Sequence, residues 1–371
     1  MEKIPAENKR IRRYVMKKLN LAIIGQGRSG KDIHGKYYLS ADNLYFDVKY
    51  VVDEDADRRT ISEARYPGCK TFADYRELFA CEDIDLVVNA TYSQYHYSIT
   101  KELLQHGFSV LVEKPFAKTG AQCRELMEIA KEKNVVLAVF QQPFLAPFYV
   151  SAKALAESGK LGRILQVDLR YSGFARRWDW QTLQKNCAGS LYNTGPHPVG
   201  IALGFLDFDP AAALVFSRLD KALTSGDADD YDKLILTAPG KPVVDVEICS
   251  TDAYSPYTLK IKGTLGTFQC TTKEYKLTYI VPGENPERPV QERFLQDENH
   301  NPLYCSEKLI KHQEEGAFDG DAFNTGTADF YAQLYGAITE NKPMTVTAEM
   351  AARIIDVIEA AHAQNPLPVL F

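Results

Sequence analysis

The stretch LNLAIIGQGRSG, residues 19–30, decides the fold of this chain. A short apolar run leads into the pattern G-x-G-x-x-G at Gly25, Gly27 and Gly30, and a helix-compatible stretch follows. Glycine suits these positions because the turn is tight, because the backbone must approach a pyrophosphate closely, and because helix and strand must pack without a side chain between them. The N–H groups and positive dipole end of the helix then face the phosphates. We therefore predict a dinucleotide-binding turn; a purely structural turn or a site for another nucleotide are the alternatives.

Outward from this motif, short apolar runs alternate with helical patterns through the first half of the chain. Such alternation is typical of a parallel sheet built from strand, helix, strand units. Apolar residues recur at helical spacing in 95–106 and 120–133. The unbroken runs LAII and DLVVNA fit strands that are covered on both faces. The expected strands are 19–24, 46–52, 84–90, 108–112 and 135–140.

The pattern changes after about Pro143, where short strands follow one another through Gly, Pro and Asp turns. This succession predicts a largely antiparallel sheet with one buried face. Helices are expected at 322–340 and 348–363, and the polar segment 282–316, with four prolines, is expected to be a long loop or lid. The expected strands are 164–174, 212–220, 231–238, 243–250, 258–263, 267–272 and 275–281. The whole chain is therefore expected to have an α/β fold.

Composition narrows the functional class. The 371 residues suggest two domains, placed at 19–143 and 144–371 after a charged N-terminal extension, 1–18. Lys and Arg number 43 against 49 Asp and Glu, so a net charge of −6 disfavours nucleic-acid binding. The seven cysteines form no C-x-x-C pair and are expected to be reduced thiols in a cytoplasmic protein with no metal site. No apolar run is long enough to span a membrane, and the N-terminus lacks the apolar core of a signal peptide.

The second predicted strand ends at Asp53, 23 positions after Gly30. An acidic side chain there accepts hydrogen bonds from the ribose hydroxyls and repels a 2′-phosphate. This favours NAD over NADP as the cofactor. Arg58 and Arg59 could argue for NADP, but they lie in a charged helix start, DEDADRR, and we interpret them as a solvated face.

Two further segments carry side chains suited to catalysis. Glu113, Lys114 and Pro115 follow the fourth predicted strand, at the carboxyl end where open α/β sheets bind ligands. The lysine charge needs a partner, which Glu113 or a substrate hydroxyl could provide, and Pro115 could introduce a cis peptide. In GSLYNTGPHPVG, residues 189–200, Asn193 and His197 are four apart, so one helical turn would bring them to the same side. Histidine exchanges protons near neutral pH. Taken alone, the first segment could be an exposed turn and the second could hold a buried structural histidine.

Together these motifs resemble a known family. The glycine motif, Asp53, the run 89–91 followed by His96, the triplet 113–115 and the loop 189–197 occur in the order found in the glucose-fructose oxidoreductase, inositol dehydrogenase and rhizopine-catabolism family (Gfo/Idh/MocA). The closing segment TAEMAARIIDVIEAAH, residues 347–362, is also similar to the last helix of that family. The resemblance covers nearly the whole chain after Leu19.

The resemblance implies a Rossmann domain, a second α/β domain whose open sheet builds a homodimer or tetramer, and an active site in the cleft between them. It implies that Lys114 binds the substrate hydroxyl and that His197 accepts its proton, with Asn193 as a third catalytic-site residue. The family commonly has aspartate where this chain has Asn193, and proline where it has Tyr92. An amide can orient His197 but cannot raise its basicity by charge. The expected NAD-binding residues are Gly25, Gly27, Arg28, Ser29, Gly30, Asp53, Thr91, Tyr92, His96, Glu113 and Lys114.

The segment FARRWDW, residues 174–180, is expected near this cleft. Tryptophan faces stack on sugar rings and Arg or Asp side chains bind vicinal hydroxyls, so we expect Arg177 and Trp178 to bind substrate with Lys114, Asn193 and His197. For Trp180 a core position is an equal alternative. The resemblance then implies NAD-dependent oxidation of a secondary hydroxyl of a sugar or glycoside, with the 3-hydroxyl of a glucoside favoured. The alternatives are an inositol 2-dehydrogenase, a glycosidase that uses transient oxidation at C3, a non-enzymatic NAD and sugar sensor, and an NADPH-dependent aldehyde or biliverdin-type reductase.

Overall fold

A computed structural model describes residues 17–371, so most of the predicted N-terminal extension, residues 1–16, lies outside the described residues. In the described part the predicted parallel sheet is present, with six strands in the order β3-β2-β1-β4-β5-β6. Every neighbouring pair in this sheet is parallel. The strands are β1 Leu19–Ile24, β2 Phe46–Val52, β3 Lys70–Phe72, β4 Leu86–Asn89, β5 Val110–Val112 and β6 Leu137–Val139.

The sequence pattern overestimated three of these strands and missed β3. Ile84, Phe108 and Val135 begin the predicted runs but precede the strands, where they pack half-buried against the core. An apolar run can therefore start before the hydrogen-bonded strand does. β3 has only three residues, one of them exposed, and so carries no clear alternation.

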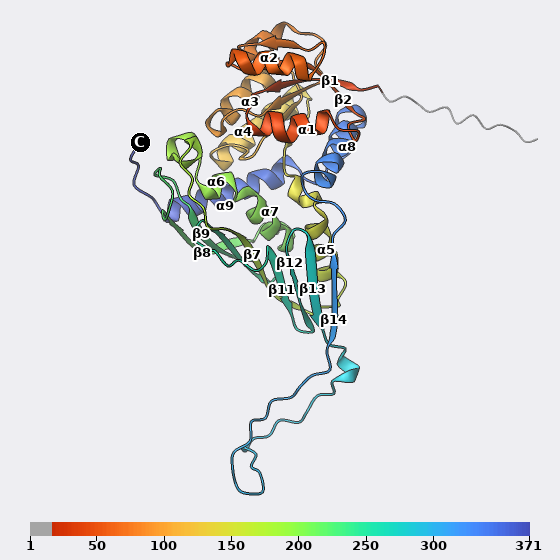
Figure 1. The fold of residues 1–371 in the computed structure, drawn as a ribbon, viewed down its shortest axis with the longest axis vertical. Helices are drawn as coiled ribbons and strands as arrows, with labels where there is room; N and C mark the ends of the chain where they lie inside the picture. The colour runs from red at the N-terminus through yellow and green to blue at the C-terminus, as the bar shows by residue number, and fades with distance from the viewer. Residues whose placement is uncertain (1–16) are drawn as a thin grey trace, which may run out of the picture.

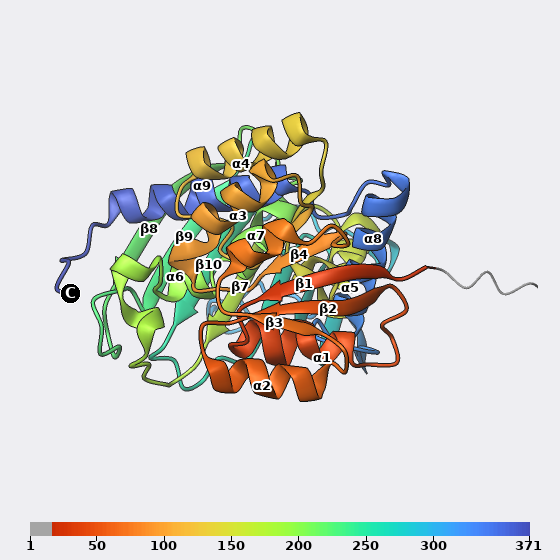
Figure 2. The same ribbon diagram turned by 90° about the horizontal axis from the view of Figure 1, so that it is seen from above.

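Helices cover both faces of this sheet, as Figure 2 shows from above. One cover comes from far along the chain: Phe330, Tyr331 and Leu334 of α8 share a buried cluster with Leu21 and Phe46 of the sheet. The boundary predicted at residue 143 stays a prediction, and α8 packs across it. The helices of the first half are α1 Gly35–Tyr38, α2 Ala56–Arg65, α3 His96–Gln105 and α4 Gly120–Lys133; α8 spans Thr325–Glu340.

The second sheet confirms the largely antiparallel arrangement predicted for the later half. Its eight described strands run in the order β14-β13-β12-β11-β7-β10-β9-β8, and β7 pairs with β10 in parallel while the other neighbours are antiparallel. The strands are β7 Ile164–Ser172, β8 Ala213–Asp220, β9 Tyr231–Thr237, β10 Val243–Cys249, β11 Leu259–Gly263, β12 Gly266–Cys270, β13 Glu274–Tyr279 and β14 His312–Ala317.

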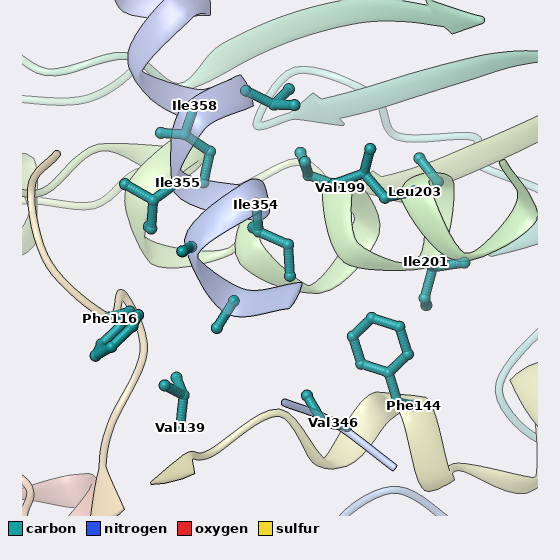
Figure 3. Close-up of a cluster of buried hydrophobic side chains, with 14 of the residues drawn as sticks. Phe116, Val139, Phe144, Val199, Ile201, Leu203, Val346, Ile354, Ile355 and Ile358 are labelled. Carbon is teal, nitrogen blue, oxygen red and sulfur yellow. The ribbon is translucent and has the colours of Figure 1, made fainter. Parts of the chain in front are cut away.

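The buried face of this sheet is covered by α7 and α9. Ile354, Ile355 and Ile358 of α9 lie beside Val199 and Leu203 of α7 in Figure 3, and all five side chains belong to the main hydrophobic cluster. Helix α9 thereby connects the sheet to the loops that follow the Rossmann strands. The helices of this half, besides α8, are α5 Pro147–Glu157, α6 Ser190–Asn193, α7 Pro196–Phe205 and α9 Ala348–Gln364.

The segment predicted to be a long loop or lid is largely a long loop, but it ends in a strand and is not a lid. Residues 312–317 form the edge strand β14, which the sequence pattern missed. The preceding residues form an exposed ribbon that leaves the sheet at the end remote from the Rossmann domain, so it does not cover the cleft (Figure 1). Polar edge strands lack the alternation on which the prediction depended: β14 reads HQEEGA.

Among residues 17–371, no helix is long and apolar enough to cross a membrane.

Candidate active site

The three motif glycines meet different surroundings in the turn after β1. Gly25 has a φ of +90°, and a Cβ at Gly30 would lie 1.9 Å from the Gly25 carbonyl oxygen. Both positions therefore exclude a side chain for reasons internal to the fold. At Gly27, in contrast, a Cβ would meet no atom within 4 Å. The open space at Gly27 is where a phosphate group can approach the backbone, so the turn fits a dinucleotide.

Asp53 lies at the carboxyl end of β2 with its side chain almost fully buried. Its Oδ2 accepts the Gln26 N–H at 2.7 Å, and its Oδ1 accepts the Asp55 N–H at 3.0 Å. Each oxygen keeps a lone pair for a ribose hydroxyl. The guanidinium of Arg58 lies 3.6 Å from Oδ2, so Arg58 reaches this carboxylate instead of standing on a purely solvated face. Arg59 donates to the carbonyl oxygens of Asp53 and Glu54.

A cleft of about 1060 Å³ begins at these residues and extends to the loop 189–197. It contains most of the residues that the sequence analysis selected, although they come from both halves of the chain. Gly30, His96 and Trp178 lie outside it. The predicted residues that line it are Gly25, Gly27, Arg28, Ser29, Asp53, Thr91, Tyr92, Glu113, Lys114, Arg177, Asn193 and His197.

Lys114 lies in this cleft two residues after β5, and its partner in the protein is not Glu113, the first of the two predicted alternatives. The ammonium Nζ donates to the backbone carbonyl of Asn193 at 2.7 Å. The Glu113 carboxylate instead pairs with His34 Nε2 at 3.1 Å and accepts the Lys114 backbone N–H at 3.0 Å. Burial alone would raise the pKa of Glu113, but the hydrogen bond and charge of His34 lower it to about 2. The Lys114–Pro115 peptide is cis.

The ammonium of Lys114 stands in a cationic neighbourhood. Burial lowers its pKa from the usual value, Glu113 opposes this shift, and the nearby charges of Arg28 and Arg177 lower the pKa further. A lysine held in this way is a compact positive charge available to a developing alkoxide.

His197 takes its orientation from a residue that the sequence analysis missed. Its Nδ1 lies 3.3 Å from Oε1 of the buried Gln141. Because this oxygen only accepts, Nδ1 carries the proton and Nε2 keeps the lone pair. Burial and the Lys114 charge lower the pKa of His197 to about 3. Gln141 follows β6, so its place at the carboxyl edge of the parallel sheet was a signal that could have identified it.

Asn193 lines the cleft but does not orient His197. Its Oδ1 accepts from Gln181 Nε2 at 2.7 Å, and Gln181 in turn accepts from Arg177 Nη2. Arg177 also pairs with Asp179 at 2.8 Å. The result is a hydrogen-bonded series of polar side chains along the substrate end of the cleft, in which Gln181 was not predicted.

Only one of the two tryptophans lines the cleft, and it is Trp180, for which the cleft and the core were equal alternatives. Trp178 is 82% exposed and lies outside the cleft, so we withdraw it as a substrate-binding residue. Trp180 lines the cleft, where its ring meets Tyr92 edge-on with a centroid distance of 4.7 Å. The backbone turns at Asp179, which begins a short helical turn, and this turn directs Trp180 inward.

His96 lies outside the cleft and bridges two of the loops that form it. Its Nδ1 lies 2.7 Å from the Pro115 carbonyl and its Nε2 3.2 Å from the Thr91 carbonyl, and the ring is buried. It therefore connects the loop after β4 to the loop after β5. Residues 17–371 contain no group of three or more His, Cys, Asp or Glu side chains that could hold a metal ion.

Two family models match the chain. Residues 19–141 match the oxidoreductase family with an NAD-binding Rossmann fold (GFO/IDH/MocA), and residues 149–269 match the GFO/IDH/MocA C-terminal domain. Among curated proteins, an uncharacterized oxidoreductase of Schizosaccharomyces pombe is 28% identical over 262 residues, 68% of this chain and 70% of that protein. The scyllo-inositol 2-dehydrogenase (NADP⁺) IolW of Bacillus subtilis is 24% identical over 355 residues, 92% of each chain. Levoglucosan dehydrogenase of Pseudarthrobacter phenanthrenivorans is 28% identical over 233 residues, 58% of each chain.

Solved structures share the fold. An NAD-binding protein from Listeria innocua has a TM-score of 0.77 at 22% identity, covering 94% of this chain and 98% of that one. GenD2 from gentamicin A biosynthesis, solved in complex with NAD, has a TM-score of 0.72 at 21% identity, covering 98% and 97%. The chain therefore belongs to the GFO/IDH/MocA family and is an NAD(P)-dependent oxidoreductase that acts on alcohols.

Proposed function

We propose that this protein is an NAD-dependent dehydrogenase that oxidises a secondary hydroxyl of a sugar or glycoside, with the 3-hydroxyl of a glucoside as the favoured position. The observation that carries the proposal is that Lys114 and His197 line the same cleft as Gly27 and Asp53. A proton acceptor and a positive charge thus stand in the cavity that fits the dinucleotide. The predicted dimer or tetramer and the cytoplasmic location stay predictions.

Each residue has a separate task in this reaction. Bound NAD supplies the hydride acceptor. Lys114 binds the reacting oxygen and stabilises the negative charge that develops on it. His197 accepts the hydroxyl proton at Nε2, because Gln141 holds the other nitrogen protonated. Since the pKa of His197 is lowered to about 3, the imidazole is neutral at ordinary pH and its Nε2 lone pair is free.

The substrate end of the cleft favours a neutral polyhydroxylated ring. Arg177, Gln181 and Asn193 offer donors and acceptors for vicinal hydroxyls, while Trp180 and Tyr92 offer aromatic surface for C–H faces. IolW is named for scyllo-inositol and another relative for levoglucosan. These names favour one second candidate, an inositol 2-dehydrogenase, which would use the same residues.

NAD is the proposed cofactor because Asp53 carries its charge where a 2′-phosphate would stand. GenD2 was solved with NAD, which agrees with this choice, whereas IolW is named for NADP⁺. Arg58 beside Asp53 moderates the repulsion of a 2′-phosphate. We therefore expect NAD to be preferred and NADP to be used more weakly.

The test measures NADH formation by absorbance with free sugars, inositols and glucosides, while aglycone release is followed in parallel. NADH formation with an intact glycosidic bond supports the proposal, and turnover confined to inositols supports the second candidate. Aglycone release without net NADH would instead identify a glycosidase that uses transient oxidation. NAD binding with no turnover on any of these alcohols, in either direction, would contradict the proposal.

A further inference from the structure

A buried polar cluster lies beneath α6, outside the cleft residues that the proposed reaction uses. It consists of Asp229 before β9, Asp232 within β9, and His362 near the end of α9. Both aspartates are buried, and the His362 ring stacks on Tyr192 with a centroid distance of 4.7 Å. We call these three residues the α6 cluster.

The contacts of His362 fit a doubly protonated ring. Its Nδ1 lies 2.9 Å from the Ile358 carbonyl oxygen, and its Nε2 lies 3.1 Å from Asp229 Oδ1. Both neighbours are acceptors, and the Asp229 carboxylate favours a proton on Nε2, so these contacts suit an imidazolium. Burial alone would lower the pKa of His362, but the hydrogen bond and charge of Asp229 raise it above the usual value.

The two carboxyl groups hold different charges. Asp229 is ionised, because it also accepts the Leu191 N–H at 2.7 Å, and the His362 pairing keeps its pKa lowered in spite of burial. Within residues 17–371, neither oxygen of Asp232 meets an N–H or O–H donor, and its side chain faces the Asp229 carboxylate. An isolated buried carboxylate is too costly to ionise, so Asp232 keeps its proton and donates it to Asp229. The cluster as a whole is then neutral.

A short series of contacts leads from this cluster to the cleft. The Asp229 carbonyl accepts the Ser190 N–H at 2.9 Å, so Asp229 binds both of the first two N–H groups of α6. The preceding residue must be glycine, since a Cβ at Gly189 would lie 2.3 Å from Asp229 Oδ1. Helix α6 ends at Asn193, whose carbonyl oxygen accepts the hydrogen bond from Lys114 Nζ.

We propose that the α6 cluster is a positioning device which holds the Asn193 carbonyl against the Lys114 ammonium, and that the charge of His362 controls this contact. The inference rests on the proposed function only in giving Lys114 a role in the reaction. Asp229, Asp232 and His362 are positioning residues, because none of them lines the main cleft.

Other charged groups face the cluster from the surrounding elements. Lys118, before α4, lies close enough to oppose the protonation of His362, and its carbonyl accepts the Tyr192 hydroxyl at 2.8 Å. The Asp230 carboxylate accepts hydrogen bonds from the backbone N–H groups of residues 222–224. The Cys249 thiol of β10 faces Asp232. Although burial lowers it, the pKa of His362 is raised above the usual histidine value by the hydrogen bond and charge of Asp229.

The sign of the pH dependence follows from the raised pKa of His362. The imidazolium is present at low pH and is lost as pH rises through its folded-state pKa, so the hold on α6 weakens in that range. The test is an NMR titration of protein labelled with ¹³C at lysine Cε and histidine Cε1. The Lys114 signal is identified by its loss in Lys114→Arg. We expect its chemical shift to show an inflection at the pKa of His362. This inflection should be absent in His362→Gln, because the glutamine amide can still donate a hydrogen bond but carries no charge.

Three variants complete the design. Asp232→Asn should retain the inflection because an amide N–H replaces the carboxyl proton, whereas Asp232→Leu should weaken or abolish it. His312→Gln is the matched control, since His312 also pairs with a carboxylate, that of Glu284 at 2.6 Å, but lies on exposed β14 away from the cleft. It should leave the Lys114 titration unchanged.

Two results would overturn the proposal: a Lys114 signal in the wild-type protein that ignores the titration of His362, or an inflection that persists in His362→Gln. The wild-type titration alone decides the matter if a variant fails to fold. A failure of the proposed function is distinguishable, because it would appear as full turnover in Lys114→Ala whatever the NMR coupling.

Discussion

The two ends of the cleft are held in place by different kinds of interaction. At the nucleotide end, backbone groups and residues without side chains determine the geometry. Gly25, Gly27 and Gly30 shape the turn, and backbone N–H groups hold the Asp53 carboxylate in place. At the substrate end, side-chain amides from separate segments orient the reactive groups, as Gln141 does for His197. The comparison shows that one end depends on steric exclusion and the other on hydrogen bonds between side chains.

The largest expected effect is at the substrate end. Lys114→Ala removes the charge that stabilises the alkoxide, and His197→Ala removes the proton acceptor. Losses of about 10²–10³-fold in kcat are typical when such a group is removed. NAD affinity, measured by isothermal titration in the absence of substrate, should change little in His197→Ala, because that side chain acts at the reacting hydroxyl. Activity close to wild type in either variant would contradict the assigned roles.

The second prediction tests the steric character of the nucleotide end with a matched pair. Gly30→Ala places a Cβ 1.9 Å from the Gly25 carbonyl, so we expect a loss of stability of about 2–4 kcal/mol together with lost NAD binding. Gly27→Ala meets no protein atom within 4 Å, so we expect unchanged stability and weakened NAD binding. Thermal unfolding without NAD and calorimetric titration with NAD separate the two effects. Equal destabilisation by both substitutions would show that Gly27 does not face the phosphates.

This difference also explains what the sequence could predict. The nucleotide end follows from one contiguous motif and from strand ends that share an edge, so β1, β2 and the place of Asp53 were predicted correctly. The hydrogen-bond partner of a given side chain was harder to predict. Glu113 was a proposed partner for Lys114, yet it pairs with His34, 79 positions earlier in the chain. No local pattern records such a contact.

Long-range packing accounts for the other differences. Helix α8 was expected at nearly the correct place in the sequence. Its packing on the Rossmann sheet, where Tyr331 contacts Phe46, was not expected. Trp178 and Trp180 are two residues apart and equally aromatic, so the sequence could not tell which one turns into the cleft. Gln141 was within reach of prediction, because it directly follows a strand that ends at the ligand-binding edge.

The third prediction gives a charge to the uncharged partner of His197 at the substrate end. Gln141→Glu gives His197 an anionic partner, which favours the imidazolium and raises the pKa of His197 from about 3. Because His197 must be neutral to accept a proton, activity is lost as pH falls through this pKa. The acid limb of the kcat/KM profile should therefore move to higher pH in the variant, while the alkaline limb stays in place. An unchanged acid limb would mean that Gln141 does not set the protonation of His197.

The smallest expected effect is at the outer rim of the nucleotide end. Arg58 lies 3.6 Å from Asp53 Oδ2 and is about half exposed, so its charge is partly screened. In Arg58→Ala the charge of Asp53 faces a 2′-phosphate without this counter-ion, and NADP affinity should fall. A half-exposed pair is worth about 0.2–1 kcal/mol, which corresponds to a change in Kd of up to about fivefold. NAD affinity should remain the same, and Arg218→Ala, which breaks the exposed pair with Asp220 on β8, should affect neither cofactor. If NAD and NADP affinities fell equally, Arg58 would be supporting the turn around Asp53, and the nucleotide end would depend on side-chain charge more than the comparison of the two ends implies.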